Sequence, residues 1–389
     1  MQYELEFEDD LIEEAEPETK ITEEPAFEVV VGGSDWTAET VISQMSRSNI
    51  SVTPRFQRRD VWNLSKKSRF IESLIAGIPI PPLVLAEDKE RRGKYIVLDG
   101  KQRLLTLMQF YGIAKEGANK FTLRDLSIIS RLEGKNISDL REPELSEYGD
   151  ALDNAIVRTV VIKNWPDSDY LHIVFIRLNS NSVALSPQEL RQALVPGEFT
   201  DLLDEASAGS KLLQQILGRE EPDFRMRDCE LLLRYLAFAF SSESYRGDLK
   251  KFLDEFSKDM NDNWEVYGDR VKAQIQVFEY ALSVGFEIFG DNFGKRWLGG
   301  QFETRRNRAI LDVLLYTFSH PNIEQLNLAG KEAVLAAFKE TSTNRKFKNA
   351  TEQTTKSIGA FKDRYSIWID VLNRHTSIDI EVPGFGTAT

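Results

Sequence analysis

The sequence predicts an α+β protein, in which a small mixed α/β head is followed by a mostly helical domain. Up to about residue 165, short β-branched segments alternate with segments of helical periodicity. Beyond about residue 197, the helical period of the apolar residues dominates. We therefore expect an acidic, poorly ordered tail over residues 1–28, a head over residues 35–195 and a helical domain over residues 197–380.

The composition is that of an ordinary folded protein, with 389 residues of which 41% are hydrophobic and 29% are charged. No stretch approaches the roughly 20 consecutive apolar residues of a membrane-spanning helix, and the basic and apolar regions of a secretory signal are missing. The single cysteine, Cys229, excludes an internal disulfide framework. We expect a cytoplasmic protein with no membrane partner.

Most of the net charge of −13 belongs to the first 28 residues, which hold twelve acidic residues and one basic residue, Lys20. The remaining chain, with 48 basic and 50 acidic residues, is nearly neutral. Such a run of like charge resists compaction and predicts a tail that is poorly ordered or ordered by a partner. A solvated leader is the simpler interpretation; a cover for a basic face is the alternative.

Cap and breaker residues predict the elements of the head. Ser65 is a favourable N-cap and Gly77 a favourable residue after a helix, so a helix is expected between them. The prolines in residues 78–82 exclude helix and lead the chain into a strand. The expected helices and strands of the head cover residues 66–76, 83–86, 95–98, 101–111, 155–162 and 167–178. The long helices expected after them cover residues 228–240, 264–289, 305–318 and 357–372.

The clearest chemistry lies where a strand gives way to a helix, at Asp99-Gly100-Lys101-Gln102-Arg103. The first turn of a helix attracts anions, because its N–H groups and the positive end of the helix dipole lie there. Gly100 lets a phosphate approach the backbone, while Lys101 and Arg103 supply cationic donors. Asp99 could hold a metal ion or orient a water. An Asp-capped helix with solvated charges is the alternative.

Two further segments have residue types that suit phosphates. Residues 54–62 interleave arginines with aromatic residues, which suits phosphate or base contacts, although a loop pinned by its aromatic residues is an equal alternative. Arg177 and Asn179 stand at a helix end, a position that asparagine also favours for conformational reasons. Next, Ser186 and Glu189 form the capping box of another helix.

Taken together, these motifs resemble the N-terminal domain of GmrSD-type modification-dependent restriction enzymes in their order and spacing. The resemblance covers about residues 35–240. Its motifs are Pro54–Trp62, Phe70–Pro81, Val97–Leu107, Phe175–Asn179, Leu185–Leu190 and Glu230–Ala237. It implies a ParB/sulfiredoxin-like core that holds nucleotide phosphates, and a link to nucleotide hydrolysis and defence against phage or modified DNA.

The resemblance also implies roles for particular residues. The implied phosphate loop is Asp99, Gly100, Gln102 and Arg103, with Asp99, Gln102 and Arg103 as the catalytic candidates and Gly100 and Lys101 beside the nucleotide. The implied remaining contacts to the nucleotide are Gln57, Arg58 and Trp62 from the first motif and Arg177 and Asn179 from the second wall. One departure bears on turnover, because the family usually has glutamine where this chain has Lys101.

A nuclease centre of the HNH type is not expected in this chain. Full-length restriction proteins of this kind add such a domain, which needs histidines around a metal ion. Here His172 lies in an apolar helix, His320 precedes a proline that ends a helix, and His375 stands alone. If DNA is cut, we expect a partner to cut it.

The leading hypothesis is a regulatory subunit of a prokaryotic antiphage or restriction system that binds and hydrolyses a nucleoside triphosphate. Mg²⁺ is the expected cofactor, with Asp99 and Glu72 as the candidate carboxylates. DNA is expected as a partner, directly or through a partner nuclease, and a homo-oligomer is left open. The alternative is a non-enzymatic ParB-like DNA-binding module that uses basic stretches such as Lys295–Arg308. A nuclease with an unrecognised centre ranks third.

Overall fold

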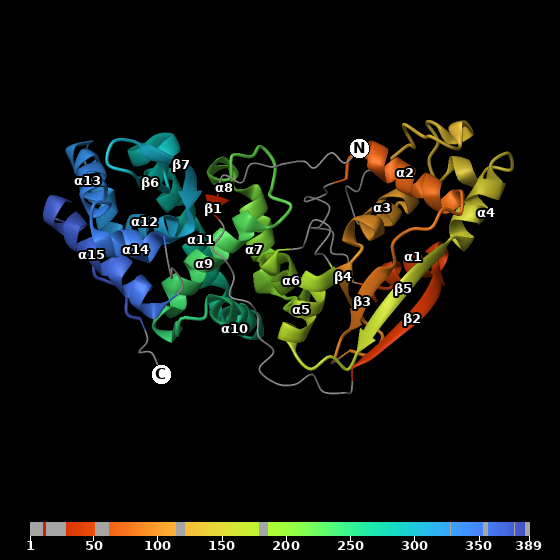
Figure 1. Ribbon diagram of the computed structural model, residues 1–389, viewed down its shortest axis with the longest axis horizontal. Helices are drawn as coiled ribbons and strands as arrows, with labels where there is room; N and C mark the ends of the chain where they lie inside the picture. Colours follow the sequence, from red (N-terminus) through yellow and green to blue (C-terminus); the bar gives the residue numbers. More distant parts are fainter. Residues whose placement is uncertain are drawn as a thin grey trace. The chain divides into compact units, whose positions relative to one another are not determined.

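The computed structural model describes residues 11–12, 29–50, 62–89, 91–113, 121–178, 186–326, 328–352, 357–376 and 378–385. The chain divides into two compact units (Figure 1). The head spans Glu18–Leu194, and the helical unit comprises Met1–Pro17 and Val195–Thr389. A small sheet followed by a mostly helical region confirms the predicted α+β class.

The head contains a four-stranded mixed sheet in the order β2-β5-β3-β4. Its strands are β2 (Val30–Thr37), β3 (Leu83–Glu87), β4 (Tyr95–Asp99) and β5 (Ile156–Lys163). Strand β5 runs parallel to β3 and antiparallel to β2, and β3 and β4 form an antiparallel pair. The central position of β3 explains why its residues are apolar almost without interruption.

Helices cover both faces of this sheet (Figure 1). On one face, Leu83 and Leu85 of β3 join a core formed largely by α1 to α4. On the other face, Val84 and Ala86 pack with residues of α5 and α6. The helices of the head are α1 (Ala38–Ser46), α2 (Leu64–Ile75), α3 (Lys101–Tyr111), α4 (Ser146–Asn154), α5 (Ser168–Leu178) and α6 (Pro187–Leu194).

One expectation for the head was wrong in detail, and one strand was not predicted. Helix α2 begins at Leu64, two residues earlier than expected, because Asn63 is its N-cap and accepts a hydrogen bond from the Lys66 N–H at 2.9 Å. Ser65, the expected cap, lies inside the helix. Strand β2 was not predicted, and its two glycines give it a weak β propensity. Its pairing with β5 along all eight residues makes it one.

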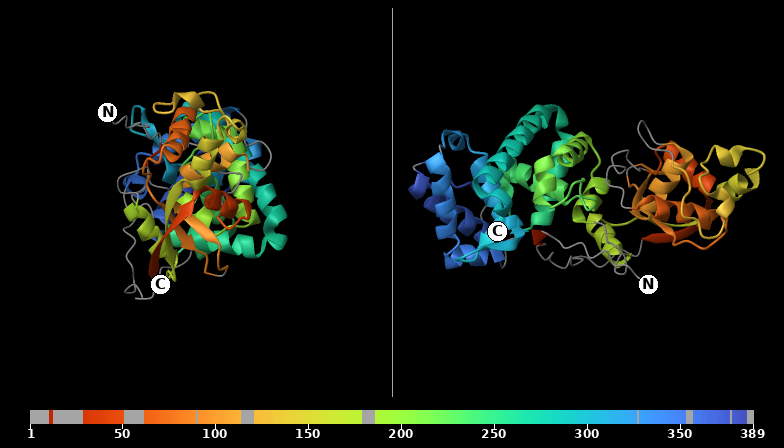
Figure 2. Two further views of the ribbon diagram at one scale, coloured as in Figure 1. Left: turned by 90° about the vertical axis from the view of Figure 1, so that its right-hand side faces the viewer. Right: turned by 90° about the horizontal axis from the view of Figure 1, so that it is seen from above.

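The helical unit consists mainly of helices that pack side by side, from green to blue in Figure 2. They are α7 (Glu198–Gly209), α8 (Lys211–Ile216), α9 (Arg227–Ser241), α10 (Leu249–Asp262), α11 (Trp264–Phe289), α12 (Arg308–Phe318), α13 (Leu328–Thr341), α14 (Arg345–Glu352) and α15 (Ile358–Thr376). Within the described residues, none of the helices has both the length and the apolar character needed to cross a membrane.

A small sheet interrupts this helical unit, in the order β1-β7-β6. Its strands are β1 (Leu11–Ile12), β6 (Lys295–Trp297) and β7 (Phe302–Asn307). The helix expected from residue 305 therefore begins only at Arg308, because the residues before it pair with β6. The Asn307 side chain caps α12 by accepting a hydrogen bond from the Ile310 N–H at 3.1 Å.

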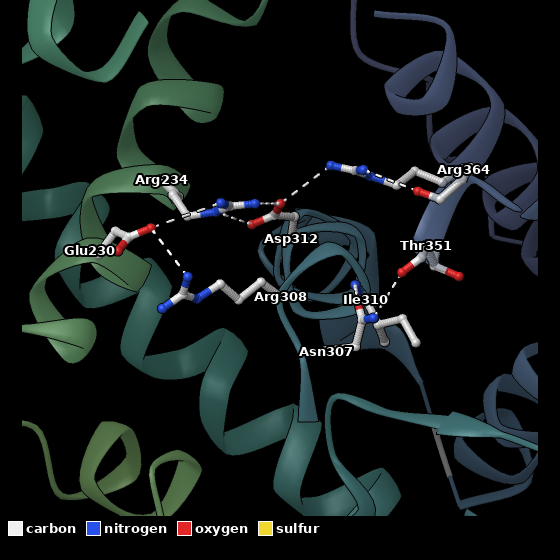
Figure 3. A network of polar contacts seen from close by, with 9 residues as sticks. Glu230, Arg234, Asn307, Arg308, Ile310, Asp312, Thr351 and Arg364 are labelled. Carbon is white, nitrogen blue, oxygen red and sulfur yellow. Dashed lines mark hydrogen bonds and ion pairs between the residues drawn. The ribbon is translucent and has the colours of Figure 1, made fainter. Parts of the chain in front are cut away.

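A network of buried charges joins three helices of this unit (Figure 3). Asp312 on α12 accepts hydrogen bonds from Arg234 on α9 at 3.1 and 2.5 Å, and from Arg364 on α15 at 3.4 Å. The three side chains are at most 5% exposed. Because both guanidinium groups share one carboxylate, Asp312 is the residue on which this network depends.

Replacing Asp312 with alanine is expected to destabilise the helical unit by about 3–5 kcal/mol, because two arginines lose their buried acceptor. Denaturant unfolding followed by circular dichroism measures the change. Glu255→Ala is the matched control, since Glu255 forms an ion pair whose two side chains are 69% and 68% exposed. A loss for Asp312→Ala no larger than for this control would contradict the expectation.

A candidate phosphate loop at the start of α3

The turn between β4 and α3 has a conformation that requires glycine. Gly100 has φ +100° and ψ 11°, in the left-handed region, and serves as the N-cap of α3. A Cβ atom at Gly100 would lie 2.3 Å from Cδ2 of Leu83 on β3. The bare backbone is thus demanded by the packing against β3, and it places the N-terminus of α3 at the end of the sheet.

An ion pair across the turn fixes its shape. Asp99 accepts a hydrogen bond from the Gly100 N–H at 2.7 Å and from Nη2 of Arg103 at 2.8 Å. The same guanidinium donates from Nη1 to the carbonyl of Pro81 at 2.7 Å. Arg103 is only 7% exposed. Arg103 thus connects the turn to the proline segment that precedes β3, and these contacts fix the conformation of the loop.

Lys101 begins α3 and reaches across to α6. Its Nζ lies 3.0 Å from Oε1 of Glu189, and the two side chains are 12% and 6% exposed. Glu189 also accepts a hydrogen bond from the Ser186 N–H at 2.8 Å, while its own N–H donates to the Ser186 hydroxyl at 3.1 Å. The predicted capping box is confirmed. The sequence did not indicate that Glu189 is also the partner of Lys101, because the capping-box motif predicts only a local function for Glu189.

Trp62, the last residue of the first motif, also lies beside the loop. Its N–H donates to Oε1 of Gln102 at 3.4 Å. Its ring meets Phe70 of α2 edge to face, with centroids 5.7 Å apart, and the Lys66 ammonium lies 5.0 Å from the ring centre. The structure therefore brings Trp62 and Gln102 together from segments 40 residues apart in the sequence.

The other candidates for nucleotide contact are placed differently. Arg177 lies exposed in the last turn of α5. Gln57, Arg58 and Asn179 lie outside the described residues. The described residues that the fold gathers at the turn are Trp62, Asp99, Gly100, Lys101, Gln102, Arg103 and Glu189.

The expectation that Glu72 holds a metal ion is not supported by its surroundings. Glu72 lies on α2 and is 1% exposed. Its carboxylate accepts backbone N–H groups of Ser127, Ile128 and Ile129 at 3.1, 2.7 and 2.8 Å. The carboxylate anchors the segment that follows residue 121 and has its hydrogen bonds already filled, so Glu72 is a structural residue.

These contacts also set the acidity of Glu72. Burial by itself raises the pKa of the carboxyl, but donation from the N–H groups of Ile129 and Ile128 outweighs it. The pKa consequently lies below its usual value.

Within the described residues, no group of three or more histidine, cysteine or acidic side chains is arranged to hold a metal ion. His375 was expected to stand alone, but its Nε2 lies 2.8 Å from Oε2 of Glu340. His320 precedes a short 3-10 helix, η6 (Pro321–Gln325), and its Nδ1 accepts the Asn322 N–H at 3.3 Å. A magnesium ion held mainly by phosphates and water needs no such cluster, so Mg²⁺ at Asp99 stays a prediction.

The model of a known protein family matches part of the chain. The model of the family described as GmrSD restriction endonuclease, N-terminal domain, matches residues 39–196. The match begins in α1 and ends just after α6, so it includes the turn at Gly100 and Glu189 but not the helices of the second unit. Searches of curated proteins and of solved structures found no match.

Gly100→Ala is expected to destabilise the head by more than Gly93→Ala. Both positions have positive φ, +100° and +79°, but a Cβ atom at Gly93 meets nothing within 4 Å. The left-handed backbone costs about 1–2 kcal/mol in either variant, and the collision with Leu83 adds to it only at Gly100. Thermal unfolding of the two variants separates the cost of the left-handed backbone from that of the collision. Equal losses of stability in the two variants would show that Leu83 can move aside.

Glu72→Gln is expected to destabilise the head by about 1–3 kcal/mol near neutral pH, because the charge-assisted bonds to the backbone are weakened. A lowered pKa means that the carboxylate stabilises the fold above the unfolded pKa and loses this effect as pH falls through the folded value. The difference between variant and wild type, measured by denaturant unfolding from pH 7 to pH 3, should therefore shrink towards acid. A difference independent of pH would contradict the assignment.

Proposed function

We propose that the domain over residues 39–196, which matches the model of the GmrSD restriction endonuclease N-terminal domain, binds a nucleoside triphosphate and hydrolyses it. In this proposal the protein is a regulatory subunit of an antiphage or restriction system, and a partner acts on DNA. The proposal rests on the geometry of the turn at Gly100 and on the match to the family model.

The observation that carries the proposal is the placement of a cation at a helix N-terminus. Helix α3 begins at Lys101, and the positive end of its dipole lies at the end of the sheet. The ammonium of the same residue is largely buried, with a side chain 12% exposed. A phosphate at this point would meet both the helix end and a cation shielded from water, where charge–charge attraction is strongest.

The neighbouring residues have distinct proposed roles. Asp99 and Arg103 hold the loop in shape through their ion pair, and we assign Arg103 a positioning role in place of direct phosphate contact. Gln102 lies next to the Trp62 backbone and is the candidate for orienting an attacking water. The Asp99 side chain is 38% exposed, and each carboxylate oxygen has a second lone pair, so it could accept a water of hydrated Mg²⁺.

Binding and phosphate release are measured for ATP, GTP, CTP and UTP with Mg²⁺, in wild type and in Lys101→Ala. The variant is expected to bind at least about tenfold more weakly, because it removes a charged donor to phosphate. Lys163→Ala is the control, since Lys163 is another cation of the head, on β5, with a side chain 46% exposed.

Thermal unfolding of each variant shows whether the head stays folded. Saturable binding by wild type together with phosphate release would establish a nucleotide hydrolase. If wild type bound none of the four nucleotides but bound DNA with a steep salt dependence, the proposal would fall and the DNA-binding alternative would take its place.

A further inference from the structure

The ion pair between Lys101 and Glu189 joins two motifs that are 88 residues apart in the sequence. Through this contact α6 reaches the proposed phosphate loop. Both side chains are nearly buried, at 12% and 6% exposed. A buried pair of this kind is sensitive to any new charge beside it, because water screens it poorly.

Helix α6 holds the Glu189 carboxylate in place independently of Lys101. One carboxylate oxygen, Oε2, accepts the Ser186 N–H, while the other, Oε1, faces the ammonium. Leu190, the next residue, is 3% exposed and belongs to the core on that face of the sheet. The negative charge therefore stays close to the loop whether or not the lysine remains bound to it.

A phosphate at the N-terminus of α3 would compete with this fixed carboxylate for the same ammonium. Lysine has three N–H donors, but two anions drawn to one buried cation repel each other. Glu189 would keep its bond from Ser186 after losing the lysine, which limits the cost of separation.

We propose that Glu189 is an internal competitor for Lys101, and that nucleotide phosphate displaces it and so releases the link between α3 and α6. This inference rests on the proposed function, since it names the regulation of the same loop. The link is closed in the nucleotide-free protein and open in the bound protein. Glu189 thereby lowers the affinity for nucleotide, and the contact between α6 and the loop depends on whether nucleotide is bound.

The position of α6 in the chain gives this release a consequence. Helix α6 ends at Leu194, and the next residue, Val195, belongs to the helical unit. Asn261 on α10 donates to the Val195 carbonyl at 3.0 Å and accepts the Phe199 N–H at 3.0 Å. A Cβ atom at Gly197 would lie 2.2 Å from Oδ1 of Asn261. The residues that directly follow α6 are thus held by hydrogen bonds within the helical unit.

The test compares the binding of ATP, GTP, CTP, UTP and tripolyphosphate by wild type and Glu189→Gln, using isothermal titration calorimetry. The variant is expected to bind at least about fivefold more tightly, the lower end of typical coupling between sites. Glu87→Gln is the matched control, because Glu87 also forms an ion pair in the head, with Lys163. Glu87 lies opposite Tyr95 in the sheet, and Tyr95 is at the other end of β4 from Asp99. The affinity of this control should equal that of wild type.

Hydrogen exchange of the wild-type protein provides a second readout that needs no variant. Nucleotide should speed the exchange of amides in the first turn of α6, since the link to Lys101 opens. Unchanged or slower exchange on binding would overturn the proposal even if Glu189→Gln failed to fold.

The outcomes separate this inference from the proposed function. If wild type binds nucleotide and Glu189→Gln binds it equally or more weakly, Glu189 does not compete and only the inference falls. If Glu189→Gln binds and wild type does not, both are supported, with a closed link in the wild type. If neither protein binds nucleotide or tripolyphosphate, both are overturned.

Discussion

The left-handed turn at Gly100 is the constraint on which the candidate site depends. It allows the chain to leave β4 and enter α3 within one residue, against Leu83 of β3. The Asp99–Arg103 pair and the bond from Arg103 to the Pro81 carbonyl then fix this turn to the segment before β3. Lys101 reaches Glu189, and Gln102 reaches Trp62, only because the start of α3 is held in this place.

Buried charge has an architectural role in both units. In the head, Glu72 binds the backbone of a distant segment, and Arg103 binds a carbonyl and a carboxylate. In the helical unit, Asp312 gathers two arginines from different helices. Each of these groups is costly to bury without its partners, so each specifies which segments must meet.

The pair formed by Lys101 and Glu189 differs from these in one respect. Lys101 stands at a helix N-terminus, where anions are attracted, and its ammonium is largely buried. Its carboxylate partner is anchored by its own helix. A charge pair with one fixed member, beside an anion-attracting helix end, is suited to exchange one anion for another.

The sequence by itself determined the local features, because they depend on neighbouring residues. Gly77 and Gly112 after their helices, the capping box of Ser186 and Glu189, and the helix over Trp264–Phe289 all follow from cap residues and apolar periodicity. The similarity to the matched family model was also visible in sequence, since the motifs keep their order and spacing. The tertiary structure alone decided which distant residues meet. It made β2 a strand through pairing with β5, turned Glu72 into a backbone anchor, and gave Lys101 its partner on α6. None of these contacts has a local signal, because burial and pairing depend on segments far away in the chain.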